Sequence, residues 1–177
     1  MQHETRQKTP TEGDLLRLAE LLEREDEQYR RLLRLAWRQN SYMKRQDVDR
    51  LDANSREWSH YLAQANQTRA AREKFMVNLA RKTGIEAPAG HISAFLESGP
   101  QATTNRIRRL LMRIKATALK LARQNELNRS LAEFCLDLAR EESEIFKRCV
   151  LDDPSGCYGE NARKADRGPG GVLVRQA

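Results

Sequence analysis

The chain has 177 residues, of which 39% are apolar and 32% are charged, and its net charge is +7. This length suffices for one domain with a core, and the composition is typical of long amphipathic helices with narrow buried faces. It excludes a compact mixed sheet fold, which would need more runs of Val and Ile. The positive charge makes acidic proteins, nucleic acid and anionic lipid candidate partners.

Neither a membrane span nor a signal peptide is predicted. No run of eighteen apolar residues occurs, and the start of the chain lacks an apolar stretch. We therefore expect a cytoplasmic protein. Three cysteines without close pairing indicate reduced thiols. Cys135 and Cys149 fall on the apolar seam of a predicted helix, where we expect them to pack as small apolar side chains.

The sequence gives no support for catalysis or for a metal. Only three histidines occur, without a Gly-rich phosphate loop or a Cys-x-x-Cys pair. Glu57 and His60 have the Glu-x-x-His spacing of di-iron bundles, but these sites need a second copy, which is missing. We therefore predict no catalytic residue, no cofactor-binding residue, no cofactor and no metal ligand.

The first predicted helix spans about residues 10–40 and follows a disordered N-terminus, residues 1–9. Its expected start has Thr9 as N-cap, Pro10 at the first helical position and Glu12 at the third, which is a capping box. Leucines then repeat at intervals of three and four residues, which predicts one buried face.

A second helix is predicted over about residues 47–82. The apolar pattern loses its phase after Met43, so we expect a chain break near residues 39–41 and an N-cap at Asp47. The second helix then folds back antiparallel to the first. Gly84 suits the left-handed position that ends a helix.

The third predicted helix spans about residues 103–151, with Thr103 or Thr104 as its cap. A short amphipathic turn, residues 91–97, precedes it and covers one end of the bundle. Residues 10–152 then form one helical domain, followed by a flexible Gly-rich tail, residues 153–177. The predicted fold is all-α, an elongated up-down-up three-helix bundle or antiparallel coiled coil.

The charge pattern supports the up-down-up order. The first helix is acidic and then basic, whereas the third is basic up to Arg123 and acidic from Glu126 onward. If the two helices are parallel, their halves attract each other, although each exposed pair contributes only a few tenths of a kcal/mol. We therefore expect the first and third helices to be parallel neighbours.

The middle and the second half of the third helix carry the candidate partner surface. Asn125 and Asn128 are polar residues in an apolar seam, where a buried amide can fix register or partner. Beyond them the apolar arc widens, and by length this part extends past the second helix. A wide apolar face with too few partners in its own chain indicates a binding groove or a dimer interface. Its apolar residues include Leu131, Phe134, Leu138, Ile145 and Phe146.

Two other function classes fit parts of this pattern. The basic run from Arg106 to Arg123 is the best candidate for binding nucleic acid, but it contains no aromatic residue for stacking bases, and a solvated face paired with the first helix explains it as well. A homodimeric structural coiled coil would use the same apolar face as the candidate groove. Tyr158 lies in the predicted flexible tail, where an isolated aromatic residue is typical of a linear docking motif.

The chain resembles the FlgN family of flagellar export chaperones. Two elements carry the resemblance: Asn125 and Asn128, three apart in a long leucine-bearing helix, and Tyr158 followed by Gly159 in the tail. The order of the helices is also similar over roughly residues 14–162. The family tail commonly reads Tyr-Gly-x-x-Gly, whereas Ala162 stands at the second glycine here.

The resemblance implies a non-catalytic cytoplasmic chaperone for the hook-filament junction proteins, also called hook-associated proteins. In the family, the C-terminal helix holds the amphipathic C-terminal segment of the client, prevents its self-association and delivers it to the gate of the flagellar type III export apparatus. By position the client-binding helix is 103–149, with 131–149 as its main surface, and Tyr158 matches the gate-docking tyrosine. We expect a monomer or homodimer that does not bind nucleic acid.

Overall fold

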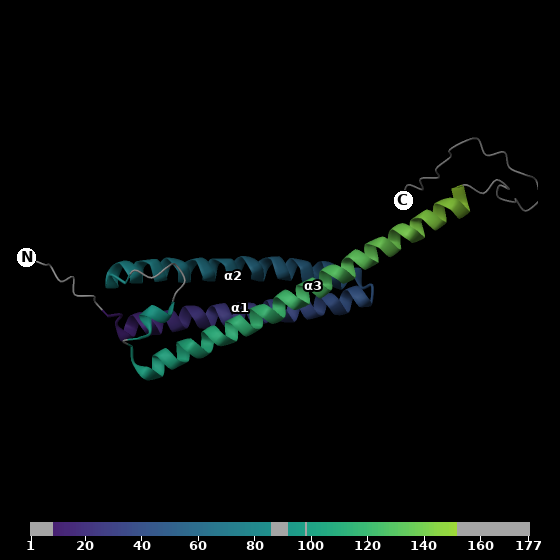
Figure 1. The fold of residues 1–177 in the computed structure, drawn as a ribbon. Helices are drawn as coiled ribbons and strands as arrows, with labels where there is room; N and C mark the ends of the chain where they lie inside the picture. The colour runs from purple at the N-terminus through teal and green to yellow at the C-terminus, as the bar shows by residue number, and fades with distance from the viewer. Residues whose placement is uncertain (1–8, 86–91, 98, 152–177) are drawn as a thin grey trace, which may run out of the picture. The chain divides into compact units, whose positions relative to one another are not determined.

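The structure is a computed structural model that describes residues 9–85, 92–97 and 99–151. In these ranges the fold is all-α, as the sequence predicted (Figure 1). Residues 1–8 of the predicted disordered N-terminus and the tail with Tyr158 lie outside the described residues. The elements in chain order are α1 (Glu12–Lys44), α2 (Val48–Thr83), the 3-10 helix η1 (Ile92–Phe95) and α3 (Gln101–Leu151).

The chain divides into two compact units, Met1–Ser130 and Leu131–Ala177, which we call the first and second units. The boundary falls within α3. The first unit therefore contains α1, α2, η1 and the first part of α3, and the described residues of the second unit are the rest of α3. In the first unit α1 and α2 run antiparallel, and α3 starts near the beginning of α1 and follows its direction (Figure 1).

The start of α1 differs from the prediction by two residues. Thr11, not Thr9, is the N-cap, and its hydroxyl accepts a hydrogen bond from the backbone N–H of Asp14 at 3.2 Å. The carboxylate of Asp14 in turn accepts from the backbone N–H of Thr11 at 3.0 Å, which completes a capping box. Thr9 and Thr11 each have an acid three residues later, Glu12 and Asp14, so the sequence offers two capping boxes, and the structure forms the second.

The break between α1 and α2 also lies later than predicted. α1 continues through residues 39–41 to Lys44, and the chain turns at Arg45 to Asp47, where Gln46 has a φ of 55°. The phase of the apolar residues could not locate the turn, because α1 continues as a regular helix past residues 39–41 and ends only at Lys44. Asp47 caps α2 as predicted, and its carboxylate accepts from the backbone N–H of Arg50 at 3.1 Å.

The predicted glycine C-cap of α2 is confirmed. Gly84 has a left-handed φ of 69°, and its N–H donates to the carbonyl of Ala80 at 2.9 Å. A residue with a Cβ is disfavoured in this conformation, which explains glycine at this point.

α3 begins two residues earlier than predicted. It starts at Gln101, so Thr103 and Thr104 lie inside its first turn, and both are buried. The hydroxyl of Thr104 donates to the carbonyl of Gln101 at 3.1 Å, which satisfies this hydroxyl inside the helix. The two threonines are therefore packing residues at the end of the bundle rather than caps.

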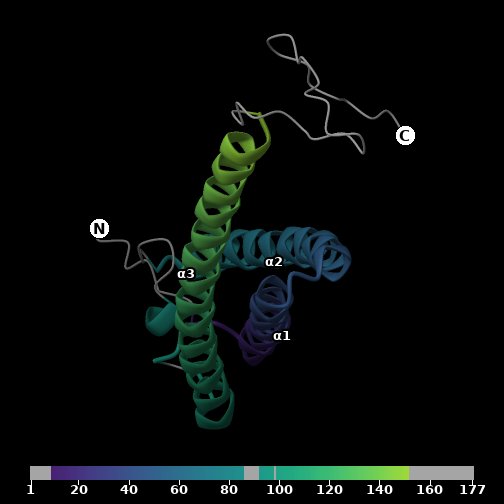
Figure 2. The same cartoon turned by 90° about the vertical axis from the view of Figure 1, so that its right-hand side faces the viewer.

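Two apolar clusters form the core of the first unit. The larger one joins all four elements, and η1 lies close to the beginnings of α1 and α3, as the turned view also shows (Figure 2). Phe95 of η1 is 2% exposed, so the predicted cover over this end of the bundle is present. The smaller cluster joins α1, α2 and α3 further along and comprises Leu32, Leu33, Ala36, Ala65 and Leu121.

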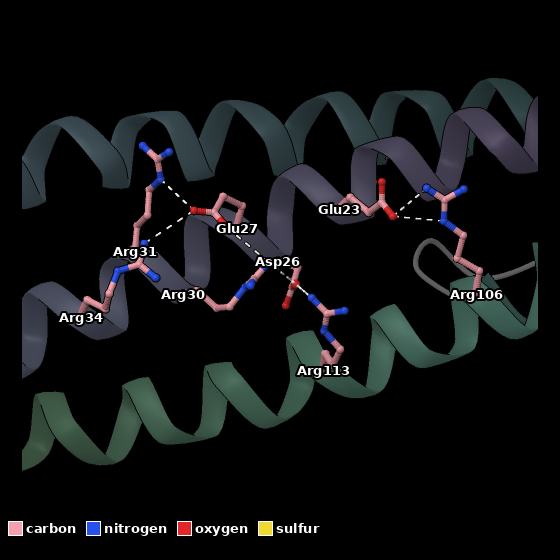
Figure 3. A network of polar contacts seen from close by, with 8 residues as sticks. All are labelled: Glu23, Asp26, Glu27, Arg30, Arg31, Arg34, Arg106 and Arg113. Atoms are coloured by element: carbon pink, nitrogen blue, oxygen red, sulfur yellow. Dashed lines mark hydrogen bonds and ion pairs between the residues drawn. The ribbon is translucent and has the colours of Figure 1, made fainter.

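Ion pairs join the acidic half of α1 to the basic half of α3, as the charge pattern predicted. Arg106 donates to the carboxylate of Glu23 at 2.7 Å, and Arg113 reaches the buried carboxylate of Asp26 (Figure 3). Asp26 is 1% exposed, so its charge depends on Arg113 and on Arg30, which lies at 3.0 Å. This pairing accounts for two of the cations in the basic run.

Candidate functional site

The described side chains of the second unit form a single exposed helical surface. Leu131 is half-buried, and every side chain from Ala132 to Cys149 is exposed. Large apolar residues are rarely left in water in such number along one helix. The four largest exposed apolar side chains of the predicted partner surface are Phe134 at 65%, Leu138 at 42%, Ile145 at 61% and Phe146 at 64%.

Helical spacing gathers these residues on one face. At about 100° per residue, Leu138 and Ile145 lie about 40° and about 20° from Phe134, and Leu131 and Phe146 complete an arc of about 120°. Leu136, which is 51% exposed, lies about 160° away from Phe134. We call the residues Leu131, Phe134, Leu138, Ile145 and Phe146 the apolar face of the second unit.

Local ion pairs support the helix beside this face. Arg140 pairs with Asp137 at 3.3 Å and Lys147 pairs with Glu144 at 3.1 Å, both at three-residue spacing. Such pairs stabilise a helix by only a few tenths of a kcal/mol each. They keep the rest of the surface polar, so the apolar face has a defined edge.

The predicted packing of Cys135 and Cys149 in a core is wrong, although both are reduced as expected. Cys135 and Cys149 are free thiols, but both are exposed instead of packed in a core. The seam spacing correctly placed them on the same side of α3 as Phe134. Because the second unit buries no side chain there, that side faces solvent.

Asn128 lies near the end of the first unit, and its side-chain amide forms four hydrogen bonds. Its Nδ2 donates to the carbonyl of Ala36 at 2.8 Å and to Oε1 of Gln39 at 3.0 Å. Its Oδ1 accepts from Nδ2 of Asn40 and from Nε2 of Gln124, both at 3.0 Å. The amide is 4% exposed and fully satisfied, so it fixes α3 against α1.

Asn125 lies apart from this network. Its side chain is exposed, whereas the sequence reasoning grouped it with Asn128 in the seam. Three residues along a helix turn the chain by about 300°, so the two amides lie only about 60° apart, but the contact with α1 is narrow. The structure thus brings Asn128, and not Asn125, to the helix interface.

A second exposed apolar set on α3 escaped the sequence reasoning. Met112, Leu119 and Leu127 are 64%, 58% and 61% exposed and belong to the first unit. Their spacing of seven and eight residues repeats on one helix face and was a readable signal. The basic residues around them were interpreted as a solvated face paired with the first helix, with nucleic acid as the alternative, and the apolar residues between them were overlooked.

Shifted pKa values occur at structural ion pairs of the first unit. The ammonium of Lys82 on α2 holds the pKa of Asp14 below its ordinary value, and the hydroxyl of Thr11 adds to this effect. The guanidinium of Arg31 likewise lowers the pKa of Glu27. Asp14 joins α1 to α2 through Lys82, whereas Glu27 pairs with arginines of its own helix, so both shifts arise from ion pairs within the fold.

Among the described residues, side chains that could bind a metal ion do not form a cluster. Glu57 lies 3.6 Å from Arg38, and His60 contacts the side chain of Gln64 at 2.9 Å. Over the described ranges, no three side chains of His, Cys, Asp or Glu form a group that could hold a metal ion. Within the same ranges, no helix is both long enough and apolar enough to cross a membrane.

The described residues define an all-α protein in which the second part of a long helix, α3, exposes an apolar face. The model of a known family, described as FlgN protein, matches residues 15–166 of this chain. The chain therefore belongs to the FlgN family, a family of flagellar export chaperones. A comparison with curated proteins found no match, and a comparison with solved structures found none.

Proposed function

We propose that this protein is a cytoplasmic export chaperone that binds the amphipathic C-terminal segment of hook-associated proteins through the apolar face of the second unit. The observation that carries the proposal is the exposure of Phe134, Ile145 and Phe146, each above 60%, on one side of a helix. A client helix that covers this face removes these side chains from water, which drives association. Family membership supplies the class of client.

The chemistry of the face fits a client helix better than a folded globular surface. The arc is about 120° wide and continues for about four turns, which matches the apolar stripe of an amphipathic helix. The same stripe would otherwise drive the clients to self-associate. Binding it in a heterodimeric contact is therefore the action of a chaperone.

Delivery to the export gate is the second half of the proposal. Tyr158 lies outside the described residues, so its role rests on the match of Tyr158-Gly159 to the family tail. We propose that Tyr158 docks the gate while the apolar face holds the client. Ala162 replaces the second glycine of the family pattern, so the docking contact includes the Tyr-Gly pair without that glycine.

The test uses the full chain and a purified hook-associated protein. We expect light scattering to show that the client's own oligomers are replaced by a complex of defined mass. A client that stays oligomeric in the presence of excess chain contradicts the proposal. A chain that forms homodimers through the apolar face and takes up no client favours a structural coiled coil instead.

Docking is tested with the cytoplasmic part of the export gate. Tyr158→Ala should weaken gate binding about tenfold or more and leave client affinity unchanged, because Tyr158 is not among the residues of the apolar face. Tyr158→Phe, which keeps the ring, is the matched control for the role of the hydroxyl. Equal loss of client and gate binding in Tyr158→Ala would contradict this division.

A further inference from the structure

The outer face of α3 in the first unit carries an exposed apolar stripe. The opposite face of the helix is committed to the core, where Ile107 and Leu110 are at most 3% exposed. Met112, Leu119 and Leu127 lie within an arc of about 80°, roughly half a turn from those core residues. All three are more than half exposed. We call Met112, Leu119 and Leu127 the outer stripe.

Five exposed cations border the outer stripe or lie within it. At about 100° per residue, two of them lie along one edge, two lie along the other and the fifth lies inside the arc. The first acid of α3 is Glu126, three residues after Arg123, so the other four cations have no acidic neighbour on their own helix. Arg108 and Lys115 lie along one edge, and Arg109 and Lys120 lie along the other. Arg123 lies inside the arc.

These cations differ from the two that pair with α1. Arg106 and Arg113 reach the carboxylates of Glu23 and Asp26. None of the five cations of the outer face pairs with an acid in the part of the chain that the structure describes. Arg109 donates only to a carbonyl of its own helix, that of Asn105, at 3.4 Å. Among the described residues, the outer face thus carries five cations without an ion pair, and four of them also lack an acidic neighbour on α3.

We propose that this outer face docks onto an anionic phospholipid surface. An apolar stripe with cations on both edges is the arrangement of a helix that lies in a membrane interface. Met112 and Leu119 would enter the boundary between headgroups and acyl chains. The long side chains of Lys115 and Lys120 reach outward from the edges, where lipid phosphates lie. This surface is separate from the apolar face of the second unit, and the inference does not rest on client binding.

Two other kinds of partner, nucleic acid and a helix of another protein, fit the outer face less well. Nucleic acid would meet exposed Met112 and Leu119 with phosphates, and no aromatic residue on this face stacks on bases. A partner helix would enclose Arg123 inside an apolar seam, where its charge loses water. At a membrane interface Arg123 reaches a phosphate without leaving the polar layer.

The experiment is cosedimentation of the full chain with vesicles of phosphatidylcholine alone or mixed with phosphatidylglycerol. We expect binding to the mixed vesicles only, and weaker binding at high salt. A triple variant, Lys115→Ala, Lys120→Ala and Arg123→Ala, should bind about a hundredfold more weakly, at about fivefold for each cation. The matched control removes three exposed cations elsewhere and should change binding less than about threefold. Its substitutions are Lys44→Ala, Arg45→Ala and Lys74→Ala.

The apolar part of the outer face is tested separately. Met112→Gln with Leu119→Gln keeps all charges and should weaken binding about tenfold or more, because the apolar side chains no longer enter the interface. Circular dichroism should stay unchanged, since both residues are exposed. Absence of binding to the mixed vesicles, equal losses in the triple variant and its control, or full binding by the glutamine pair would overturn the proposal. Tighter binding to an oligonucleotide or to a Glu-rich helical peptide would also overturn it.

Discussion

The side-chain Nδ2 of Asn128 donates a hydrogen bond of 2.8 Å to the main-chain carbonyl of Ala36. This bond joins α3 to α1 at the end of the first unit, and the amide is buried. A buried amide accepts few alternative positions, because any shift along the helix leaves its N–H groups unsatisfied. Asn128 therefore sets the register of α3 just before the second unit begins.

Replacing Asn128 tests this relationship. Asn128→Ala removes four hydrogen bonds and leaves Gln39 and Asn40 without this partner, so we expect a loss of about 2–3 kcal/mol in the free energy of unfolding. Urea denaturation measures the change. The control is Asn125→Ala, three residues earlier and exposed, which should stay within about 0.5 kcal/mol. Equal effects of the two substitutions would contradict the structural role of Asn128.

The pair of Glu25 on α1 and Arg72 on α2 is buried, with side chains 5% and 15% exposed and 2.7 Å apart. Arg72→Ala leaves the buried carboxylate of Glu25 without its cation, so the free energy of unfolding should fall by about 3–5 kcal/mol. Arg69→Ala removes an arginine of the same helix whose pair with Glu73 is exposed, and should cost less than about 1 kcal/mol. Thermal melting of both variants distinguishes the two cases, and similar melting temperatures would count against a buried pair.

The bond from Lys82 to Asp14 makes part of the stability depend on pH. Lys82 lowers the pKa of Asp14 below its ordinary value of 3.8, so the unfolded chain takes up this proton first as the pH falls. The stabilisation is complete well above pH 3.8 and is lost as the pH drops through the lower folded pKa. Because Lys82 is 54% exposed, the effect should be under about 1 kcal/mol.

Lys82→Met should therefore destabilise the protein at neutral pH, with a difference from the wild type that shrinks in acid. Denaturation curves over the acid range measure this difference. Lys74→Met is the control, because Lys74 pairs with no acid among the described residues. A Lys82→Met effect that is constant down to the acid end of the range would show that the ion pair does not contribute.

Two glycines at the same end of the bundle should respond oppositely to alanine. A Cβ on Gly99 would lie 2.3 Å from Leu15 Cδ1 and 2.9 Å from Thr104 Cγ2, so Gly99→Ala should cost about 1–3 kcal/mol. At Gly13, in the first turn of α1, the nearest such atom is 3.9 Å away, and Gly13→Ala should stabilise by about 0.5–1 kcal/mol. Chemical denaturation of both variants measures the two changes in the free energy of unfolding. No loss of stability in Gly99→Ala would mean that the surrounding residues shift to make room for the added methyl group.

Much of the fold follows from local rules in the sequence. Leucines at helical spacing predicted the core of α1, Asp47 predicted the start of α2, and Gly84 predicted its end, because these signals act within one turn. The start of α1 was missed since two threonines compete for one cap. The start of α3 was missed because Thr103 and Thr104 are buried packing residues instead of caps, which is a tertiary effect.

The candidate site was less predictable than the fold. Spacing and helix length together placed Phe134, Leu138 and Ile145 on a face with too few partners in its own chain. Cys135 and Cys149 were misjudged because they were expected to pack as in a core, although they lie on that same side of the helix. The separation of Asn128 from Asn125 depends on where α1 touches α3, which no single-helix pattern contains. The outer stripe around Leu119 was likewise hidden by its basic neighbours.

The central claim is that the apolar face of the second unit binds the client. The most direct measurement is calorimetric titration of the full chain with the amphipathic C-terminal peptide of a hook-associated protein. Phe134→Asp and Leu138→Asp should each abolish binding, because a buried unpaired carboxylate opposes association. Leu136→Asp, the same change about 160° around the helix, should bind like the wild type. All three should stay helical by circular dichroism, and unchanged binding by Phe134→Asp and Leu138→Asp would contradict the account.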